Sequence, residues 1–159
     1  MYKRQGEYLT DRLTEEALHI IEQNRNTPFL VYLAHYSVHT PLQAKPDLIE
    51  KYQAKASKRP STDDPEFRAE GDRVVRQIQN KPLYAAMIEN LDVNVGRLMD
   101  RLAALGLDQK TILIFTSDNG GLSIAEGSPT SNKPLRAGKG WTYEGGVRVP
   151  LLILSLIHI

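Results

Sequence analysis

The sequence has no cysteine, one tryptophan and no long hydrophobic run. The lack of cysteine excludes disulfides, thiolate metal sites and a cysteine nucleophile among these 159 residues. No apolar run reaches the roughly 18 residues of a membrane-spanning helix, and no signal peptide is visible. The net charge is only +1, from 20 basic and 19 acidic residues, so no basic field indicates a nucleic acid or an anionic membrane. We therefore expect no nucleic-acid partner and no membrane span.

The remaining composition is typical of one globular domain with a core of its own. Hydrophobic residues make up 41% of the chain and charged residues 25%, both close to the averages for such domains. The spacing of apolar residues, prolines and glycines predicts the elements along the chain. These are a helix over 10–23 with Thr10 as its N-cap, a buried strand over 29–37, a helix over 46–55, an exposed insertion over 55–72, a helix over 83–105 followed by Gly106, and strands over 111–118 and 147–154.

Alternating strands and helices indicate an α/β domain with a mainly parallel sheet flanked by helices. In such sheets, ligands bind beyond the carboxyl ends of the strands. Two of the predicted strands run into polar residues at that edge, one into His39 and the other into Asp118 and Asn119. We therefore expect the fold to bring these residues together.

The strand "TILIFTSD" ends at Asp118, which Asn119 and two glycines follow. A carboxylate and an amide carbonyl are hard oxygen ligands suited to calcium or magnesium. Gly120 and Gly121 allow the backbone to turn away and leave the site open to a ligand. The same residues are common in an ordinary Asx turn after a strand, so this pattern leaves both interpretations open.

Seven of the eleven glycines lie between Gly120 and Gly146, which makes this loop the most specialised backbone of the chain. Within the loop, Lys139 stands between Gly138 and Gly140, whose missing side chains let an anion approach the ammonium group. A solvated lysine in a flexible loop would have the same pattern. Three further charged residues of the loop are expected to form surface or structural ion pairs, namely Arg136, Glu144 and Arg148.

Three histidines have different surroundings in the sequence. His39 follows a buried strand, where an imidazole can donate a proton to a leaving group, bind an anion or serve only as a structural residue. His35 lies within the strand run and is expected to be structural, or to support a neighbouring site residue. His19 lies on the first helix and is expected to be exposed.

The chain resembles the sulfatases of the alkaline phosphatase superfamily, arylsulfatase type, in the segments "PFLVYLAHYSVHTPLQA", "TILIFTSDNGG" and "PLRAGKGWTYEGGVRVP". The long helix between the first two segments fits the same order, and the resemblance covers about residues 8–152. It implies a partial alkaline-phosphatase-like sandwich and the hydrolysis of sulfate esters. It also implies a sulfated small molecule or carbohydrate as substrate, and a periplasmic or extracellular location.

The resemblance further implies a role for four residues. Asp118 and Asn119 match two ligands of the family's calcium ion. Lys139 matches the lysine that binds the sulfate group, and His39 matches the histidine that contacts it near the bridging oxygen. The implied cofactors are one Ca²⁺ and a formylglycine residue.

The chain lacks the C/S-x-P-x-R motif from which the family makes its formylglycine nucleophile. In the family, that motif precedes the region matched here, as do two calcium-binding aspartates, an arginine and a lysine-histidine pair. We therefore expect residues 1–159 to be the central part of an incomplete sulfatase catalytic domain, without its N-terminal third and its C-terminal part, and inactive alone. The ends "MYKRQ" and "LSLIHI" depart from the family pattern and are expected to be non-native.

Two other functions fit the same residues. A phosphate or phosphonate ester hydrolase of the same superfamily commonly has an Asp-His pair at the strand end, where this chain has Asp118-Asn119. A non-catalytic, sugar-binding relative would keep the fold and lose the C/S-x-P-x-R motif.

Overall fold

The computed structural model describes residues 6–60 and 62–157. The expectation that "MYKRQ" is non-native lies outside the described residues, as do the last two residues of "LSLIHI". The elements in chain order are α1 (Leu9–Gln23), α2 (Pro46–Ser57), β1 (Phe67–Glu70), β2 (Arg73–Arg76), α3 (Pro82–Ala104), the 3₁₀ helix η1 (Asp108–Lys110), β3 (Ile112–Thr116), α4 (Glu144–Val147) and β4 (Leu151–Ser155).

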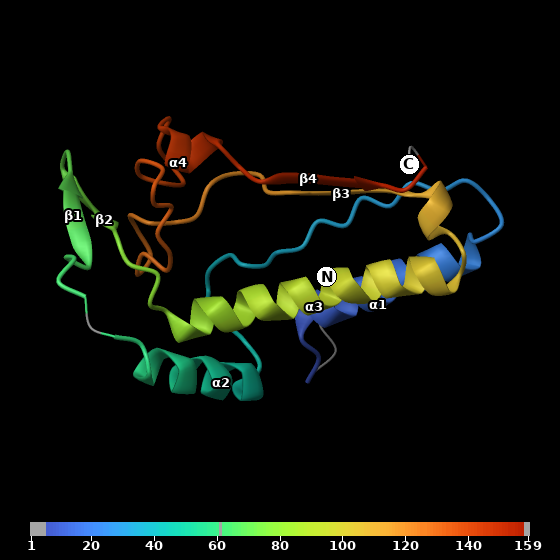
Figure 1. Ribbon diagram of the computed structural model, residues 1–159, viewed down its shortest axis with the longest axis horizontal. Coiled ribbons are helices and arrows are strands. Elements are labelled where there is room, and N and C mark those ends of the chain that lie inside the picture. The colour runs from blue at the N-terminus through green and yellow to red at the C-terminus, as the bar shows by residue number, and fades with distance from the viewer. Residues whose placement is uncertain (1–5, 61, 158–159) are drawn as a thin grey trace.

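The main core lies between α1 and α3, which run side by side along the molecule (Figure 1). Ala17 and Ile21 of α1 meet Leu98 and Leu102 of α3, and all four are buried. Within each helix these residues are four apart, so they form one apolar stripe that faces the neighbouring helix. The predicted helical periods over 10–23 and 83–105 are therefore confirmed.

A polar network around Asp11 adds a second contact between α1 and α3. Asn90 and Asn94 donate from their side-chain amides to one carboxylate oxygen of Asp11, at 2.9 and 2.8 Å, and Lys45 lies 2.5 Å from the other oxygen. Both asparagines are fully buried, so the carboxylate satisfies amides that water cannot reach. Burial alone would raise the pKa of Asp11, but the hydrogen bonds from Lys45, Asn94 and Asn90 lower it overall.

The apolar run after α1 is extended but belongs to no strand among the described residues. Phe29, Val31 and Leu33 pack against the core of α1 and α3. The alternate residues point away, and Leu30 and Tyr32 remain 94% and 92% exposed. The predicted buried strand is therefore wrong for this structure, because the run is apolar on both faces and the described chain covers only one of them.

The prediction of a mainly parallel sheet is also wrong. The described residues form two separate two-stranded sheets, β1-β2 and β3-β4, and both are antiparallel. A parallel pair needs a crossover connection, usually a helix, whereas β3 and β4 are joined by a loop whose only helix is the four-residue α4. The fold remains a mixed α/β arrangement, with α1, α2 and α3 on one side and the β3-β4 ribbon, together with α4, on the other (Figure 1).

Several element ends differ from the prediction. Tyr8, not Thr10, is the N-cap of α1, and the Thr10 hydroxyl lies 2.6 Å from the hydroxyl of Ser37. Pro46 begins α2 as predicted, and Gly106 follows the C-cap of α3 with a φ of 66° that suits glycine. The exposed insertion over 55–72 contains β1, which the sequence did not predict. None of the helices in the described chain has the length and apolarity that a membrane crossing requires.

Candidate functional site

Two predicted site residues that lie 100 positions apart in the sequence are in direct contact. The ammonium nitrogen of Lys139 lies 2.8 Å from Nε2 of His39. The other ring nitrogen, Nδ1, lies 2.8 Å from the carbonyl oxygen of Thr40, which can only accept a hydrogen bond. Nδ1 therefore carries the proton, and Nε2 accepts from the ammonium. Lys139 is half-buried and His39 is exposed, so the pair is open to a ligand.

Asn132 holds the backbone that carries Lys139. Its side-chain amide donates to the carbonyl oxygens of Gly121 and Ala137, at 2.8 and 2.9 Å, and its side-chain oxygen accepts from the Gly121 amide at 2.9 Å. The Lys139 amide also donates to the Gly121 carbonyl, at 3.0 Å. The start of the glycine-rich loop is thereby fixed against its later part. No local pattern in the sequence marked Asn132 for this role.

Five glycines, Gly120, Gly121, Gly138, Gly145 and Gly146, allow the two parts of this loop to pack closely against each other. The Gly120 amide donates to the Gly146 carbonyl at 2.9 Å, and the Gly145 amide donates to the Arg136 carbonyl at 2.8 Å. A Cβ atom at Gly120 would lie 1.7 Å from the carbonyl oxygen of Gly145, and one at Gly138 would lie 2.3 Å from that of Gly121. The loop therefore has this shape only because these positions have no side chain.

Asp118 and Asn119 lie directly after β3 and just before Gly121, whose carbonyl accepts from the Lys139 amide. The Ser117 hydroxyl donates to the main-chain oxygen of Asn119 at 2.9 Å, which forms a tight turn. No hydrogen bond or ion pair of the described residues engages either side chain. Asp118 is exposed and Asn119 is half-buried, so both can reach a ligand.

The side chains of Asp118 and Asn119 have the chemistry of calcium ligands, but two side chains are too few to bind the ion alone. A carboxylate and an amide oxygen are ligands that calcium prefers, and here neither is occupied by another protein group. Calcium takes about six to eight oxygen ligands. Within residues 6–60 and 62–157, no group of three or more His, Cys, Asp or Glu residues could hold a metal ion. The chain thus offers part of a coordination shell, and no direct contact joins Asp118 or Asn119 to the Lys139-His39 pair.

The loop over 122–133 also touches the segment of His39. The Thr40 hydroxyl donates to the Glu126 carboxylate. Glu126 was not recognised in the sequence, because an exposed acidic residue in a loop carries no local signal of its partner. Together with Lys139, it links the glycine-rich loop to the end of the extended run.

Arg76 anchors the β1-β2 hairpin to the same loop. Its guanidinium is 2% exposed, donates to the main-chain oxygen of Ser128 and lies 2.5 Å from Glu66 and 2.6 Å from Asn80. The hydrogen bond from Arg76 lowers the pKa of the Glu66 carboxyl. A buried guanidinium with these partners is costly to disturb, so the hairpin is held firmly against the loop.

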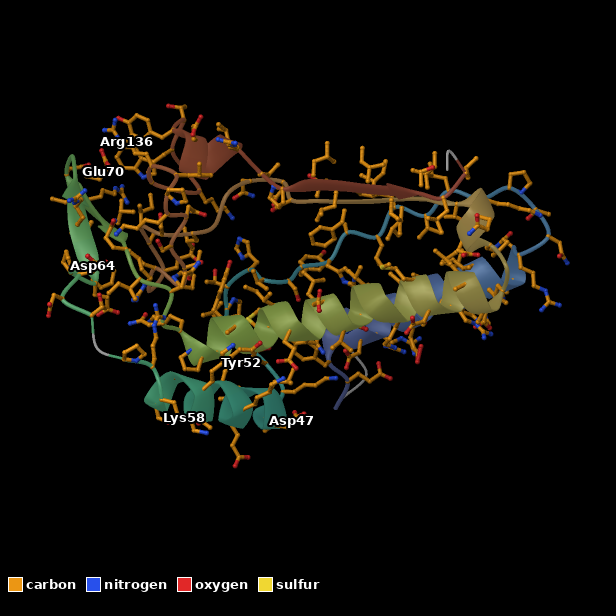
Figure 2. All side chains as sticks on the ribbon, in the orientation of Figure 1. Asp47, Tyr52, Lys58, Asp64, Glu70 and Arg136 are labelled. Atoms are coloured by element: carbon orange, nitrogen blue, oxygen red, sulfur yellow. The ribbon has the colours of Figure 1, made fainter. Side chains whose placement is uncertain are left out.

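The predicted ion pairs of the glycine-rich loop are confirmed. Arg136 lies 2.5 Å from Glu70 at the end of β1, and its guanidinium lies 3.8 Å from the centre of the Tyr143 ring. Figure 2 labels Arg136 and Glu70 next to each other. Arg148 pairs with Glu144 at 3.5 Å. The hydrogen bond from Arg136 lowers the pKa of Glu70. The Arg136-Glu70 pair joins the hairpin to the loop, whereas the Arg148-Glu144 pair is local to α4.

His35 and His19 also match their predictions. Both ring nitrogens of His35 are buried and have no hydrogen-bond partner, and burial lowers the pKa of this histidine. His35 is thus a packed, neutral residue. His19 is exposed, with Nε2 2.7 Å from the Gln23 amide nitrogen.

Known proteins are similar in sequence to this chain over almost its full length. A sulfatase of Formosa agariphila is 37% identical over 155 residues, which cover 91% of this chain and 24% of that protein. Steryl-sulfatase of Mus musculus is 34% identical over 151 residues, which cover 91% of this chain and 20% of that protein. The chain therefore spans about a quarter or less of the length of these relatives.

The same likeness extends to solved structures. The crystal structure of Ps i-CgsB in complex with k-i-k-neocarrahexaose matches with a TM-score of 0.74 and 32% sequence identity, over 99% of this chain and 30% of that one. The sulfatase family model matches residues 1–158. With a match of this extent, the chain belongs to the sulfatase family.

Proposed function

We propose that this chain is the central part of an enzyme that hydrolyses sulfate esters with a formylglycine nucleophile and one calcium ion. The contact between Lys139 and His39 carries the proposal, because it joins a cation of the glycine-rich loop to a proton-transferring group at the end of the extended run. The proposed substrate is a sulfated carbohydrate or aryl ester. The solved relative Ps i-CgsB, in complex with k-i-k-neocarrahexaose, supports a carbohydrate. We also propose that the enzyme is exported to the periplasm or the cell exterior.

In this proposal, Lys139 binds the sulfate oxygens. Its ammonium group is a compact charge, and the flanking glycines let a tetrahedral anion come close to it. Its position is set by the hydrogen bonds of Asn132 and of its own amide to Gly121. A donor that is fixed before the reaction stabilises the charge that develops on the sulfate oxygens without a cost of reorganisation.

In the same proposal, His39 acts on the ester oxygen that leaves when the sulfate group is transferred. Its Nδ1 proton is directed at the Thr40 carbonyl, which fixes the ring and turns Nε2 toward Lys139. When the bond between sulfur and the ester oxygen breaks, that oxygen takes up a proton, which the doubly protonated ring of His39 donates from Nε2 and so returns to the neutral form with its proton on Nδ1. While the ring is doubly protonated, the Lys139 ammonium donates to the sulfate oxygens and not to Nε2. The neighbouring ammonium keeps the sulfate group next to this nitrogen.

Asp118 and Asn119 would hold part of the calcium ion's shell, with the remaining ligands supplied from elsewhere in the complete enzyme. Bound calcium offsets the negative charge of the sulfate group during transfer. The hydrogen bond from the Lys139 amide to the Gly121 carbonyl connects the segment of these two ligands to that of Lys139.

The test uses Lys139→Ala and His39→Ala in the complete enzyme. Each variant should fold normally and lose about 10²–10³ of its turnover of an aryl sulfate, since each removes one group that acts in the transition state. Matched controls are Lys133→Ala in the same loop and His19→Ala on α1, both at exposed positions. Wild-type rates in both site variants would contradict the proposal. Faster turnover of the matching phosphate ester by the unmodified enzyme would favour a phosphate hydrolase instead.

A further inference from the structure

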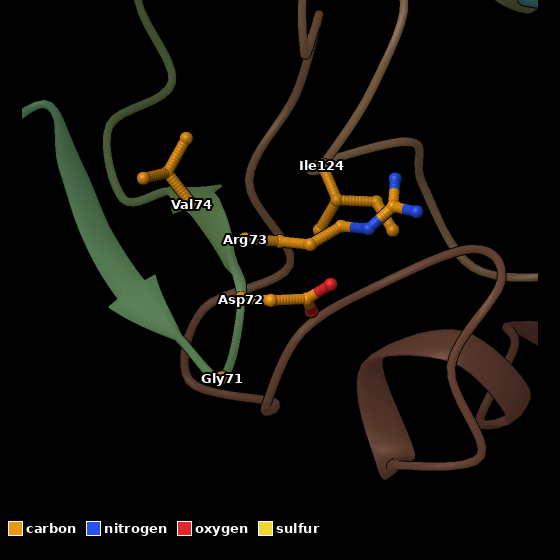
Figure 3. A pocket seen from close by; sticks show the side chains of 5 residues that line it. All are labelled: Gly71, Asp72, Arg73, Val74 and Ile124. Atoms are coloured by element: carbon orange, nitrogen blue, oxygen red, sulfur yellow. The ribbon is translucent and has the colours of Figure 1, made fainter.

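An open hollow of about 630 Å³ lies beside the turn between β1 and β2 (Figure 3). Its lining consists of Gly71, Asp72, Arg73, Val74 and Ile124. The first four belong to the hairpin turn and the start of β2, and Ile124 comes from the loop that follows β3. In Figure 3, the side chains of Asp72 and Arg73 extend from the turn toward the side on which Ile124 lies.

Ile124 connects this hollow with the loop of Lys139. Its neighbour Ser123 accepts a hydrogen bond from the Arg76 amide at 2.9 Å, which places Ile124 next to β2. On its other side, the end of the Ile124 side chain would be 3.8 Å from a Cβ atom at Gly140. Gly140 directly follows Lys139, so the hollow adjoins the part of the loop that carries the proposed sulfate-binding lysine.

The hairpin turn is rigidly attached. At its base, Arg76 is buried against Glu66 and the Ser128 carbonyl, and at its tip Glu70 pairs with Arg136. These contacts join the turn to both halves of the glycine-rich loop. A ligand in the hollow would therefore meet a backbone that is already in place, which lowers the entropy cost of binding.

Arg73 differs from the other two arginines near the hollow. Arg76 and Arg136 are paired with Glu66 and Glu70. No hydrogen bond or ion pair from within the described part of the chain engages the side chain of Arg73 or of Asp72. A guanidinium has five donors in a planar fork that matches a sulfate or a carboxylate, and a carboxylate accepts hydrogen bonds from sugar hydroxyls.

We propose that this hollow binds the non-reacting part of the substrate, and that Arg73 there receives a second anionic group while Asp72 accepts from a hydroxyl. The inference rests on the proposed function, because it places the reacting sulfate at Lys139. The ligand is thus a sugar sulfate with a second negative charge, either another sulfate or a carboxylate. The enzyme would prefer such substrates over esters with a single charge.

The test compares Arg73→Gln with Arg68→Gln in the complete enzyme. Arg68 lies on β1 of the same hairpin, is exposed and does not line the hollow, so its replacement removes the same charge at another place. The substrates are 4-methylumbelliferyl sulfate and three disaccharides, which carry one sulfate, two sulfates, or one sulfate and one carboxylate. The measured quantities are kcat and KM for each.

We expect Arg73→Gln to lower kcat/KM about tenfold for a doubly charged disaccharide, mainly through KM, as for the loss of one charge-assisted hydrogen bond at an exposed site. The singly charged substrates should change less than twofold, and Arg68→Gln should match the wild type. A lower kcat/KM for both doubly charged disaccharides means that Arg73 binds either anionic group. A lower kcat/KM for only one of them identifies the anionic group that Arg73 prefers.

An equal effect of Arg73→Gln on every substrate, or none on any, would overturn the inference. Turnover of the aryl sulfate, which has no sugar to occupy the hollow, tests the proposed function separately from this inference. If Lys139→Ala loses aryl sulfatase activity while Arg73→Gln leaves every preference unchanged, only the hollow has been misassigned. Absence of sulfate ester turnover by the wild type would overturn both.

Discussion

Replacement of Gly120 by alanine tests whether the packing of the glycine-rich loop determines the candidate site. Gly120 follows Asp118 and Asn119, and its amide donates to the Gly146 carbonyl at 2.9 Å. A Cβ atom here would lie 1.7 Å from the Gly145 carbonyl oxygen and 2.7 Å from its carbon. Both are backbone atoms, so no side chain can rotate away to make room.

The size of the effect follows from these distances. Cβ atoms essentially never approach another heavy atom closer than 3.0 Å, so the two segments would have to separate by about 1.3 Å. That movement breaks the hydrogen bond from Gly120 and leaves its amide without a partner. Overpacking and the lost hydrogen bond together should lower the free energy of unfolding by about 3 kcal/mol or more. A displacement of about 1 Å between catalytic groups can cost about 10²-fold in rate.

The assay measures thermal unfolding and aryl sulfate turnover of Gly120→Ala in the complete enzyme. Gly96→Ala is the matched control, because Gly96 lies inside α3 and its Cβ atom would have open space around it. Alanine in a helix interior should stabilise the protein by about 0.5–1 kcal/mol and leave turnover unchanged. A Gly120→Ala enzyme that melts and reacts like the wild type would refute the reasoning. So would one that loses stability but keeps its full rate.

Two further predictions concern the fold. Asp11→Ala removes the acceptor of two buried asparagine amides and should lower the free energy of unfolding by about 2 kcal/mol, measured by denaturant titration. Asp100→Ala, at an exposed position of α3, is the control and should have little effect. Equal effects of the two substitutions would contradict the role of the Asp11 network. Burial lowers the pKa of His35, so the unfolded chain takes up a proton on this imidazole more readily than the folded chain does. The free energy of unfolding should therefore be highest above the ordinary pKa of 6.5 and should decrease as the pH falls below it toward the lowered pKa of the folded state. His35→Leu should remove that part of the fall in melting temperature between about pH 7.5 and pH 5, and an unchanged pH dependence would contradict this.

The helices could be predicted from the sequence because their signals are local. The 3.6-residue period of α3 and Gly106 after its end define this helix without reference to the rest of the chain. The sheet could not be predicted in the same way. An apolar run such as 29–37 predicts a buried strand, but it does not say which strand would pair with it or in which direction. In this structure the run pairs with no strand of the described chain, and Leu30 and Tyr32 are exposed. The antiparallel pairing of β3 and β4 depends on the path of a long loop, which no periodicity encodes.

In the candidate site, too, the residues with a local sequence signal could be predicted, and those defined by distant contacts could not. Lys139 was recognisable because glycines on both sides of a lysine form a local pattern, and His39 because it ends an apolar run. Asn132 was not recognisable, since its three hydrogen bonds connect residues that are distant from one another in the sequence. Arg73 likewise looks like any charged residue of an insertion until the hairpin places it in the hollow.

These contacts explain how one chain segment can carry both the proposed sulfate-binding lysine and two of the proposed calcium ligands. Gly121 accepts hydrogen bonds from the Lys139 amide and from Asn132, and Gly120 donates to Gly146. The backbone that presents Asp118 and Asn119 is therefore the same rigid unit that presents Lys139. His39 joins this unit from outside, through its contact with the ammonium. A change that loosens the glycine packing should thus affect the oxygen ligands and the lysine together, whereas a change at His39 should leave the loop intact.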